Sequence, residues 1–273
     1  MPTSAAQLEQ RLADAIRPRR RLLTAYSGGI DSTLVAAVAR RTLGRPDAPA
    51  AIGDSASLPR HELKEARDIA ARLDLELIEI NPGEQADPNY IANPTNRCYF
   101  CKSHLYDSLH ELARQRGFPF IANGTNADDP DDHRPGLDAA KENRIISPLL
   151  EARLTKADVR TLARHLNLPN ADKPAAACLA SRIPFGTPVT PQRLSMIEQA
   201  ESVLRELNFR GFRVRHHETI ARIEVPADQL ARAIELREQI VQRLNQIGYL
   251  YVTLDLAGFR SGGGNVVLST PAQ

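Results

Sequence analysis

The 273-residue sequence has no long hydrophobic run, and this excludes several classes of protein. No stretch approaches the roughly 18 apolar residues that a membrane-spanning helix requires. The first 21 residues are polar and lack the apolar segment of a secretory signal peptide. We therefore expect a soluble, cytoplasmic protein with no membrane partner.

The sequence also lacks a large excess of positive or negative charge. Lys and Arg number 35 and Asp and Glu number 33, which leaves a formal net charge of +2. Proteins that grip a long nucleic-acid backbone usually carry a stronger basic excess. With no recognisable RNA-binding module in the chain, the sequence predicts no nucleic-acid partner.

Cysteines are few, at Cys98, Cys101 and Cys178. An odd number in a reducing compartment argues against a disulfide framework. Buried thiols would explain one isolated cysteine, but Cys98 and Cys101 form a Cys-x-x-Cys pair that requires another explanation.

Repeats and low-complexity tracts are absent, and regular alternation of elements takes their place. Apolar periodicity predicts a helix over 4–17, with Leu8, Leu12 and Ile16 on one stripe. Further helices, including one over 104–116, are predicted between and after strands at 21–26, 49–54, 75–80 and 118–123. Such alternation implies right-handed crossovers and a parallel sheet with helices on both faces. Residues 1–170 are thus predicted to form one α/β domain.

The pattern changes after residue 170. Residues 171–190 are rich in Pro, Ala and Gly and are predicted to be an active-site loop or linker. A smaller α+β domain is predicted for 191–273. Its expected elements are helices over 191–208 and 227–247, strands over 211–217, 219–225 and 249–254, and a short strand after Gly262, Gly263 and Gly264.

The loop Ser27-Gly28-Gly29-Ile30-Asp31-Ser32 stands between the first strand and a helix. Glycines let the backbone approach a phosphate closely, and the following helix directs its N–H groups and positive dipole end to the same place. Ser27 and Ser32 add hydroxyl groups. The Walker A ending and the Gly-x-Gly-x-x-Gly pattern are both missing. A tight turn with a helix cap is the alternative, but the complete arrangement predicts a site for the pyrophosphate end of ATP.

Three readings of the cysteines remain open. Cys98 and Cys101 could form a redox pair, which would leave Cys178 unexplained. With His104, the three cysteines could hold a structural zinc ion. They could instead hold three irons of a [4Fe-4S] cluster and leave the fourth iron open for delivery of sulfur.

A basic row is predicted on one face of the strand 211–217, where Arg213, Arg215 and His217 alternate with apolar residues. Arginine binds phosphates and carboxylates bidentately, so this row is a candidate anion site; a solvated strand face is the alternative. Further anion-binding candidates are Arg182, beside Cys178, and Arg260. Glu201 and Glu224 are acid candidates that could equally pair with arginines.

Three more positions have possible ligand roles. Asp54 and Ser55 end the second strand and are expected to border adenosine. Lys102 could neutralise an acyl-adenylate or lower a thiol pKa, or could be an exposed helix residue.

An acidic cluster follows the fourth strand. It contains Asp128, Asp129, Asp131 and Asp132. Ligands collect at the carboxyl ends of parallel strands, so Asp128 is a candidate near Mg²⁺ or the cluster, with an Asp- and Pro-rich turn as the alternative.

The loop at 27–32 resembles the SGGxDS motif of the PP-loop ATP pyrophosphatases, which have an adenine nucleotide alpha hydrolase-like fold. The resemblance implies Mg²⁺ together with ATP, adenylation of a substrate and release of pyrophosphate. Lys156 resembles a lysine that PP-loop enzymes place near the phosphates; an ordinary first-turn residue of a helix capped by Thr155 is the alternative. Three further segments sharpen it: Arg97 to Lys102, Gly124 to Asp129, and Asp172 to Arg182. With Arg213 to His217 and Ile220 to Glu224, the chain resembles the LarE family from about residue 10 to 268.

The LarE resemblance implies an ATP-dependent sulfurtransferase in nickel-pincer nucleotide synthesis. It implies adenylation of a carboxylate of pyridinium-3,5-biscarboxylic acid mononucleotide and conversion to a thiocarboxylate. The catalytic residues that it implies are Cys178, Cys98 and Cys101, and Lys102 and Glu201 are the further catalytic candidates. The implied substrate-binding residues, placed in a domain that also forms a homo-oligomer, are Ser181, Arg182, Arg213, Arg215, Glu224 and Arg260.

Two branches of the family differ in their source of sulfur. One sacrifices a single cysteine, which would be Cys178 here; the other uses three cysteines to hold a [4Fe-4S] cluster. Cys98 and Cys101 favour the cluster branch, supplied by sulfide or a cysteine desulfurase. The alternatives from other classes are a tRNA-thiolating PP-loop enzyme and a non-catalytic ATP-binding protein with structural zinc.

Overall fold

The computed structural model describes residues 4–129 and 135–260. It divides the chain into two compact units, Met1–Glu84 with Asn96–Ala176, and Gln85–Thr95 with Ala177–Gln273. The segment Gln85–Thr95 thus belongs to the second unit, although the sequence placed it inside a domain of residues 1–170. The glycine run at 262–264 and the strand predicted after it lie outside the described residues.

The first unit is built on a parallel sheet of four strands, which confirms the predicted fold class. Its strands are β1 (Leu22–Ala25), β2 (Ala50–Gly53), β3 (Leu77–Ile80) and β4 (Phe120–Ala122). They lie in the order β3-β2-β1-β4. The chain therefore builds outward from β1 in one direction and then returns to its other side, so the topological switch point of the sheet is beside β1.

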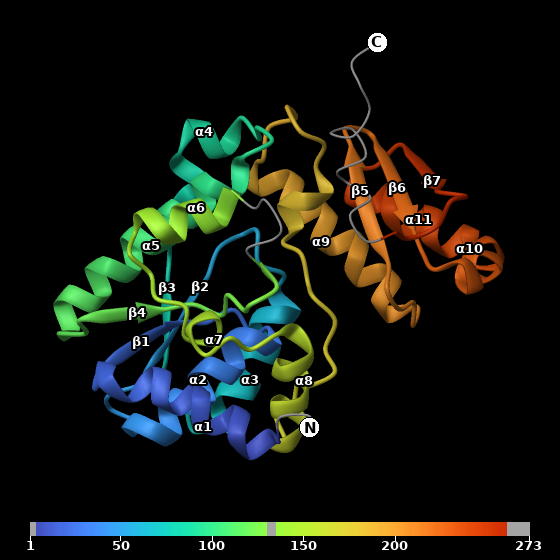
Figure 1. Cartoon of the computed structure of the whole chain (residues 1–273). Helices are drawn as coiled ribbons and strands as arrows, with labels where there is room; N and C mark the ends of the chain where they lie inside the picture. Colours follow the sequence, from blue (N-terminus) through green and yellow to red (C-terminus); the bar gives the residue numbers. More distant parts are fainter. Residues whose placement is uncertain (1–3, 130–134, 261–273) are drawn as a thin grey trace, which may run out of the picture. The chain divides into compact units, whose positions relative to one another are not determined.

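Helices cover both faces of this sheet, as Figure 1 shows. They are α1 (Ala5–Ile16), α2 (Ile30–Leu43), α3 (Arg60–Arg72), α5 (Arg97–Arg116), α6 (Pro135–Glu142), α7 (Pro148–Glu151) and α8 (Lys156–His165). Leu22 packs in a core cluster with residues of α1, α2 and α8. The next residue, Leu23, packs in a different cluster with residues of α5 and α6. This alternation follows from the two-residue period of a strand.

The ends of α1 and α8 are closed by side chains. Ser4 with Gln7, and Thr155 with Asp158, form capping boxes that satisfy N–H groups of these helices. Leu8, Leu12 and Ile16 are buried, which confirms the predicted apolar stripe of α1. By contrast, the N-cap residue of α2 is Gly29, which has no side chain to cap the helix.

The second unit has its own sheet and core. Strands β5 (Arg213–His217) and β6 (Ile220–Glu224) are antiparallel, and β7 (Tyr251–Leu254) lies parallel to β6. Helices α9 (Pro191–Glu206) and α11 (Arg237–Ile247) pack with this sheet around buried Leu204, Val214 and Leu244. The unit also contains the helices α4 (Pro88–Ile91) and α10 (Leu230–Glu235) and the 3-10 helices η4 (Leu179–Arg182) and η5 (Ala227–Gln229).

Two predicted helices were wrong in extent. The helix predicted from about residue 104 starts at Arg97, so Cys98 and Cys101 lie within α5 and not before it. The helix predicted over 227–247 is interrupted between α10 and α11, where Leu236 leaves the helical pattern. In residues 4–129 and 135–260, no helix combines the length and apolar character needed to cross a bilayer.

Candidate active site

The glycine loop lies directly after β1, at the switch point of the parallel sheet. Gly28 has a φ of +72°, and a Cβ there would stand 2.8 Å from the Cβ of Ala66 on α3. A side chain at this position would be both conformationally strained and sterically blocked. Glycine therefore lets the loop pass close to α3 on its way into α2.

The start of α2 keeps backbone donors available. In the described part of the chain, the N–H groups of Gly28, Ile30 and Asp31 donate to no other group. The Ser27 and Ser32 hydroxyl oxygens lie 3.0 Å apart, and Ser32 Oγ accepts the Ser27 N–H at 3.1 Å. Unpaired N–H groups at a helix N-terminus, together with its dipole, attract an anion.

Asp31 connects the loop to two other segments of the first unit. Its carboxylate accepts hydrogen bonds from Lys156 Nζ and, at 3.2 Å, from Asn126 Nδ2. Asp128 Oδ2 accepts the backbone N–H of Lys156 at 2.8 Å. Lys156 is therefore a first-turn residue of a helix capped by Thr155 and also a cation beside the glycine loop.

Gly124 and Asn170 also contact the loop or the start of α2. A Cβ at Gly124 would stand 2.7 Å from Ser32 N, so only glycine fits there. Asn170 Nδ2 donates to the carbonyl of Gly28 at 2.9 Å. Sequence reasoning missed Asn170, because it lies outside any motif, 142 positions from its partner in the chain.

Asp54 and Ser55 follow β2, as predicted from the strand pattern. Asp54 Oδ1 accepts from Arg60 Nη1 at 2.5 Å, and the hydroxyl oxygens of Ser55 and Ser57 lie 2.8 Å apart. These groups are therefore fixed by local partners at the carboxyl edge of the sheet.

Cys98 and Cys101 lie three residues apart in the first turns of α5, a spacing that places both on one side of the helix. Cys98 is exposed and Cys101 is half-buried. The ammonium of Lys102 lies 5.9 Å from the Tyr106 ring centroid. His104, half-buried on the same helix, also has an interaction partner.

Cys178 caps the 3-10 helix η4 in the second unit and is half-buried. All three cysteines are reduced. The carbonyl of Cys178 accepts from Arg182 Nη1 at 2.9 Å and from Ser181 Oγ at 2.8 Å. Arg182 and Glu201 form a fully buried ion pair, with Nε and Oε1 2.9 Å apart. Arg182 therefore links the Cys178 turn to α9.

Arg215 and Glu224 pair across the two antiparallel strands. Arg215 Nε and Nη2 donate to the two oxygens of Glu224, each at 3.0 Å, and Nη1 donates to the carbonyl of Ser181 at 2.9 Å. Arg222 donates to the same carboxylate at 2.9 Å. Both acid candidates, Glu201 and Glu224, are thus paired with arginines.

Arg213 differs from these two arginines. It forms no ion pair within residues 4–129 and 135–260, and its guanidinium stacks 5.0 Å from the Phe259 ring centroid. Burial, followed by the charge of Arg182, lowers the pKa of Arg213. A half-buried cation near other cations favours an anion beside it.

His217 and Arg260 complete the predicted basic group. Burial, followed by the charges of Arg222 and Arg215, lowers the pKa of His217. Its Nε2 is buried without a hydrogen-bond partner in the described residues. Arg260 is exposed at the end of the described chain.

Asn93 ties two segments of the second unit together, and sequence reasoning assigned it no role. Its side-chain amide donates to the carbonyls of Pro184 at 2.7 Å and Thr187 at 2.9 Å. The backbone carbonyl of Asn93 accepts from Gly186 N at 2.9 Å. The segment that leads into Cys98 is therefore bonded to the segment that follows Cys178.

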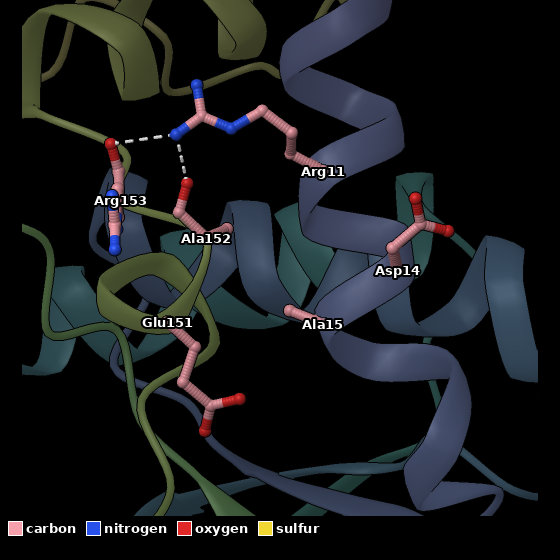
Figure 2. A pocket seen from close by; sticks show the side chains of 6 residues that line it. All are labelled: Arg11, Asp14, Ala15, Glu151, Ala152 and Arg153. Atoms are coloured by element: carbon pink, nitrogen blue, oxygen red, sulfur yellow. Dashed lines mark hydrogen bonds between the residues drawn. The ribbon is translucent and has the colours of Figure 1, made fainter.

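A hollow of about 360 Å³ is found elsewhere, between α1 and α7 (Figure 2). It is lined by Arg11, Asp14, Ala15, Glu151, Ala152 and Arg153, none of which is a predicted site residue. Arg11 donates to the carbonyls of Ala152 and, at 3.2 Å, Arg153. These bonds satisfy carbonyls that a helix end leaves unpaired, which gives Arg11 a structural role.

The donor types present fit the groups that the resemblance implies. Reduced thiols can bind an iron–sulfur cluster or zinc, and Cys98 is exposed while Cys101 and Cys178 are half-buried. The Asp31 carboxylate, already beside one cation, is the oxygen ligand type that Mg²⁺ prefers. Within each unit's described residues, no three His, Cys, Asp or Glu side chains gather as a metal-binding group; Cys178 belongs to a different unit from Cys98 and Cys101.

Comparisons with known proteins agree with the loop and the sheet. A sequence model described as asparagine synthase matches residues 4–96, the part that contains β1 and the glycine loop. The GMP synthase [glutamine-hydrolyzing] of Aeropyrum pernix is 27% identical over 67% of this chain and 39% of its own length. The first unit is therefore a PP-loop ATP-pyrophosphatase domain.

Two relatives cover nearly the whole chain. The pyridinium-3,5-bisthiocarboxylic acid mononucleotide synthase of Lactiplantibacillus plantarum is 36% identical over 96% of this chain and 95% of its own length. The uncharacterized protein slr1717 of Synechocystis sp. is 46% identical over 91% of this chain and 93% of its own length. The chain belongs to the LarE family of ATP-dependent sulfurtransferases.

Proposed function

We propose that this protein adenylates a carboxylate of pyridinium-3,5-biscarboxylic acid mononucleotide and converts it to a thiocarboxylate. The observation that carries the proposal is the glycine loop, with its unpaired N–H groups at the switch point of a LarE-family chain. A substrate carboxylate oxygen would attack the α-phosphorus of ATP, and pyrophosphate would leave. Sulfur would then attack the activated carbonyl carbon, and AMP would leave.

ATP is assigned to the first unit. The N–H groups around Gly29 and the hydroxyls of Ser27 and Ser32 would hold the pyrophosphate. Lys156 would neutralise charge that develops on the leaving pyrophosphate, and Asp31 would hold Mg²⁺. Asp54 and Ser55 would border the adenosine.

The substrate phosphate is assigned to the second unit. Arg213 carries this assignment, because it is half-buried and forms no ion pair in the described residues. Arg182 and Arg215 would present their remaining N–H groups, with Glu201 and Glu224 fixing their orientation. Ser181 and exposed Arg260 are further proposed contacts, and Lys102 would stabilise the acyl-adenylate.

The sulfur is assigned to a [4Fe-4S] cluster held by Cys98, Cys101 and Cys178. A bound cluster would supply the sulfur and spare the Cys178 side chain. The pair Cys98 and Cys101 supports this assignment, because the two thiols share one side of α5.

Pyrophosphate release tests the proposed activity. Release should require the pyridinium mononucleotide, and Cys178→Ala should retain release but lose thiocarboxylate formation. Full sulfur transfer by this variant would contradict the role of Cys178. Stimulation by tRNA instead of the mononucleotide would favour a tRNA-thiolating enzyme.

Metal analysis of anaerobically prepared protein tests the cluster. Iron and acid-labile sulfide should be present, and mass spectrometry should find Cys178 intact after turnover. Zinc without iron, or conversion of Cys178 to dehydroalanine, would contradict the cluster assignment.

A further inference from the structure

Asn170 is a buried amide that contacts the glycine loop and has no part in the activity proposed above. Its side chain lies after α8 and is 2% exposed. Its Nδ2 donates to the Gly28 carbonyl and to Thr33 Oγ1, each at 2.9 Å. One amide nitrogen therefore joins the loop to the first turns of α2.

The acceptor end of this amide is unused. Asn170 Oδ1 is buried and accepts no hydrogen bond within the described residues. A buried polar atom without a partner costs free energy. An asparagine at this buried position is therefore explained by the two hydrogen bonds that its Nδ2 donates to Gly28 and Thr33.

The geometry of a peptide bond gives this contact a consequence. The Gly28 carbonyl and the Gly29 N–H belong to one planar trans peptide and point in opposite directions. Holding the carbonyl on the Asn170 side therefore aims the Gly29 N–H to the other side. There it makes only a long bond of 3.4 Å to Ser27 Oγ, which a phosphate oxygen could replace.

Asn170 is itself held by a fixed partner. Thr33 is fully buried, and buried Tyr26 donates its hydroxyl hydrogen to the Ala66 carbonyl at 3.1 Å. Burial raises the pKa of Tyr26 to about 12, so this donor persists at neutral pH. Tyr26, the residue after β1, is thereby bonded to α3, the helix against which Gly28 packs.

We propose that Asn170 is a positioning residue for ATP, which orients the Gly28–Gly29 peptide so that the Gly29 N–H faces the pyrophosphate. The inference rests on the proposed assignment of ATP to this loop. Glycine at position 28, with φ of +72°, has little intrinsic preference for one peptide orientation. The amide supplies that preference from a distant part of the chain.

Separate titrations of magnesium pyrophosphate and of AMP test the proposal. Asn170→Ala should weaken pyrophosphate binding about tenfold and AMP binding less than about twofold. Thr33→Val is the matched control, because it removes the other contact of Nδ2 and leaves the Gly28 bond; it should cause no selective loss. Equal losses for both ligands, or unchanged pyrophosphate affinity, would overturn the positioning role.

Gly29→Pro supplies a second test that does not depend on folding of the Asn170 variant. Gly29 has a φ of −74°, which proline adopts, and proline removes the N–H. This variant should show the same selective loss, and wild-type pyrophosphate affinity would overturn the proposal. If the wild-type protein binds neither pyrophosphate nor ATP, the proposed function itself fails. If the wild-type protein binds both and the variants show no selective loss, only the positioning role of Asn170 fails.

Discussion

The two units present positive charge in different ways. The first unit offers backbone N–H groups around Gly28 and Gly29, in a space where an added Cβ at position 28 would meet Ala66. The second unit offers guanidinium groups, and two of them, Arg182 and Arg215, are buried against glutamates. A substitution that adds a side-chain atom should therefore disrupt the glycine loop of the first unit. A substitution that removes a guanidinium charge should disrupt the second unit.

Removing Arg182 should have the largest effect on stability. Arg182→Ala leaves Glu201 buried without its cation, which costs about 3–5 kcal/mol of unfolding free energy. Urea denaturation followed by circular dichroism measures this loss. Arg237→Ala, which breaks the exposed pair with Glu238 in the same unit, is the control and should cost less than about 1 kcal/mol. Equal losses would remove the distinction between buried and exposed pairs.

Adding a methyl group at Gly28 should come next. Gly28→Ala combines left-handed strain of about 1–2 kcal/mol with overlap against Ala66, for about 2–4 kcal/mol in total. Gly83→Ala is a matched control, because Gly83 has a φ of +75° and no atom within 4 Å of its added Cβ. Thermal unfolding of both variants separates strain from overlap. Equal destabilisation would contradict the tight contact with α3.

Arg213 should affect binding more than stability. Arg213→Ala should weaken binding of the mononucleotide about tenfold, because a half-buried cation without a carboxylate partner would be lost. Its stability should fall by about 1 kcal/mol or less. Arg232→Ala is the control, because Arg232 also stacks on a phenylalanine and bonds one backbone carbonyl. Similar binding by both variants, measured by titration calorimetry, would exclude a phosphate role for Arg213.

The smallest expected effect is on the pH dependence of the unfolding free energy, which should differ between the two units. Burial lowers the pKa values of His216 and His217 in the second unit, so their neutral forms favour folding. Their contribution is present above the unfolded pKa of about 6.5 and is lost as pH falls through the lowered folded values. In the first unit, burial alone would lower the pKa of Lys173, but its hydrogen bonds to Glu62 and Glu65 together raise this pKa above its ordinary value. That contribution is lost only in the alkaline range.

Urea denaturation between pH 5 and 8 measures the acid contribution. A His216→Phe, His217→Phe double variant should lose less stability on acidification than wild-type protein. An unchanged slope would show that the buried histidines do not contribute. Lys173→Met is the matching first-unit variant, which should leave the acid slope unchanged.

Local patterns predicted much of the fold and the loop, because their causes are local. The stripe Leu8, Leu12 and Ile16 and the strand–glycine–helix order follow from periodicity and backbone chemistry. The start of α5 was misplaced, because the helix was expected over 104–116 and begins at Arg97. Asn170 and Asn93 could not be found in the same way, since their partners lie 142 and about 90 positions away.

The sequence also could not predict which arginines form ion pairs with which glutamates. Arg213 and Arg215 are two residues apart on one strand face, yet only Arg215 meets Glu224. The register places Arg213 opposite Glu224 and Arg215 opposite Arg222, so the Arg215–Glu224 pair is a diagonal one that alternation alone does not predict. The sequence identified the arginines as a group, and the structure separates them.

Exchange of labelled pyrophosphate into ATP tests the central claim most directly, because it reports reversible adenylation without sulfur transfer. The proposed activity predicts exchange only when the pyridinium mononucleotide is present, and equal exchange by the Cys178→Ala variant. Exchange without that substrate, no exchange with it, or formation of ADP and phosphate would contradict adenylation at the glycine loop.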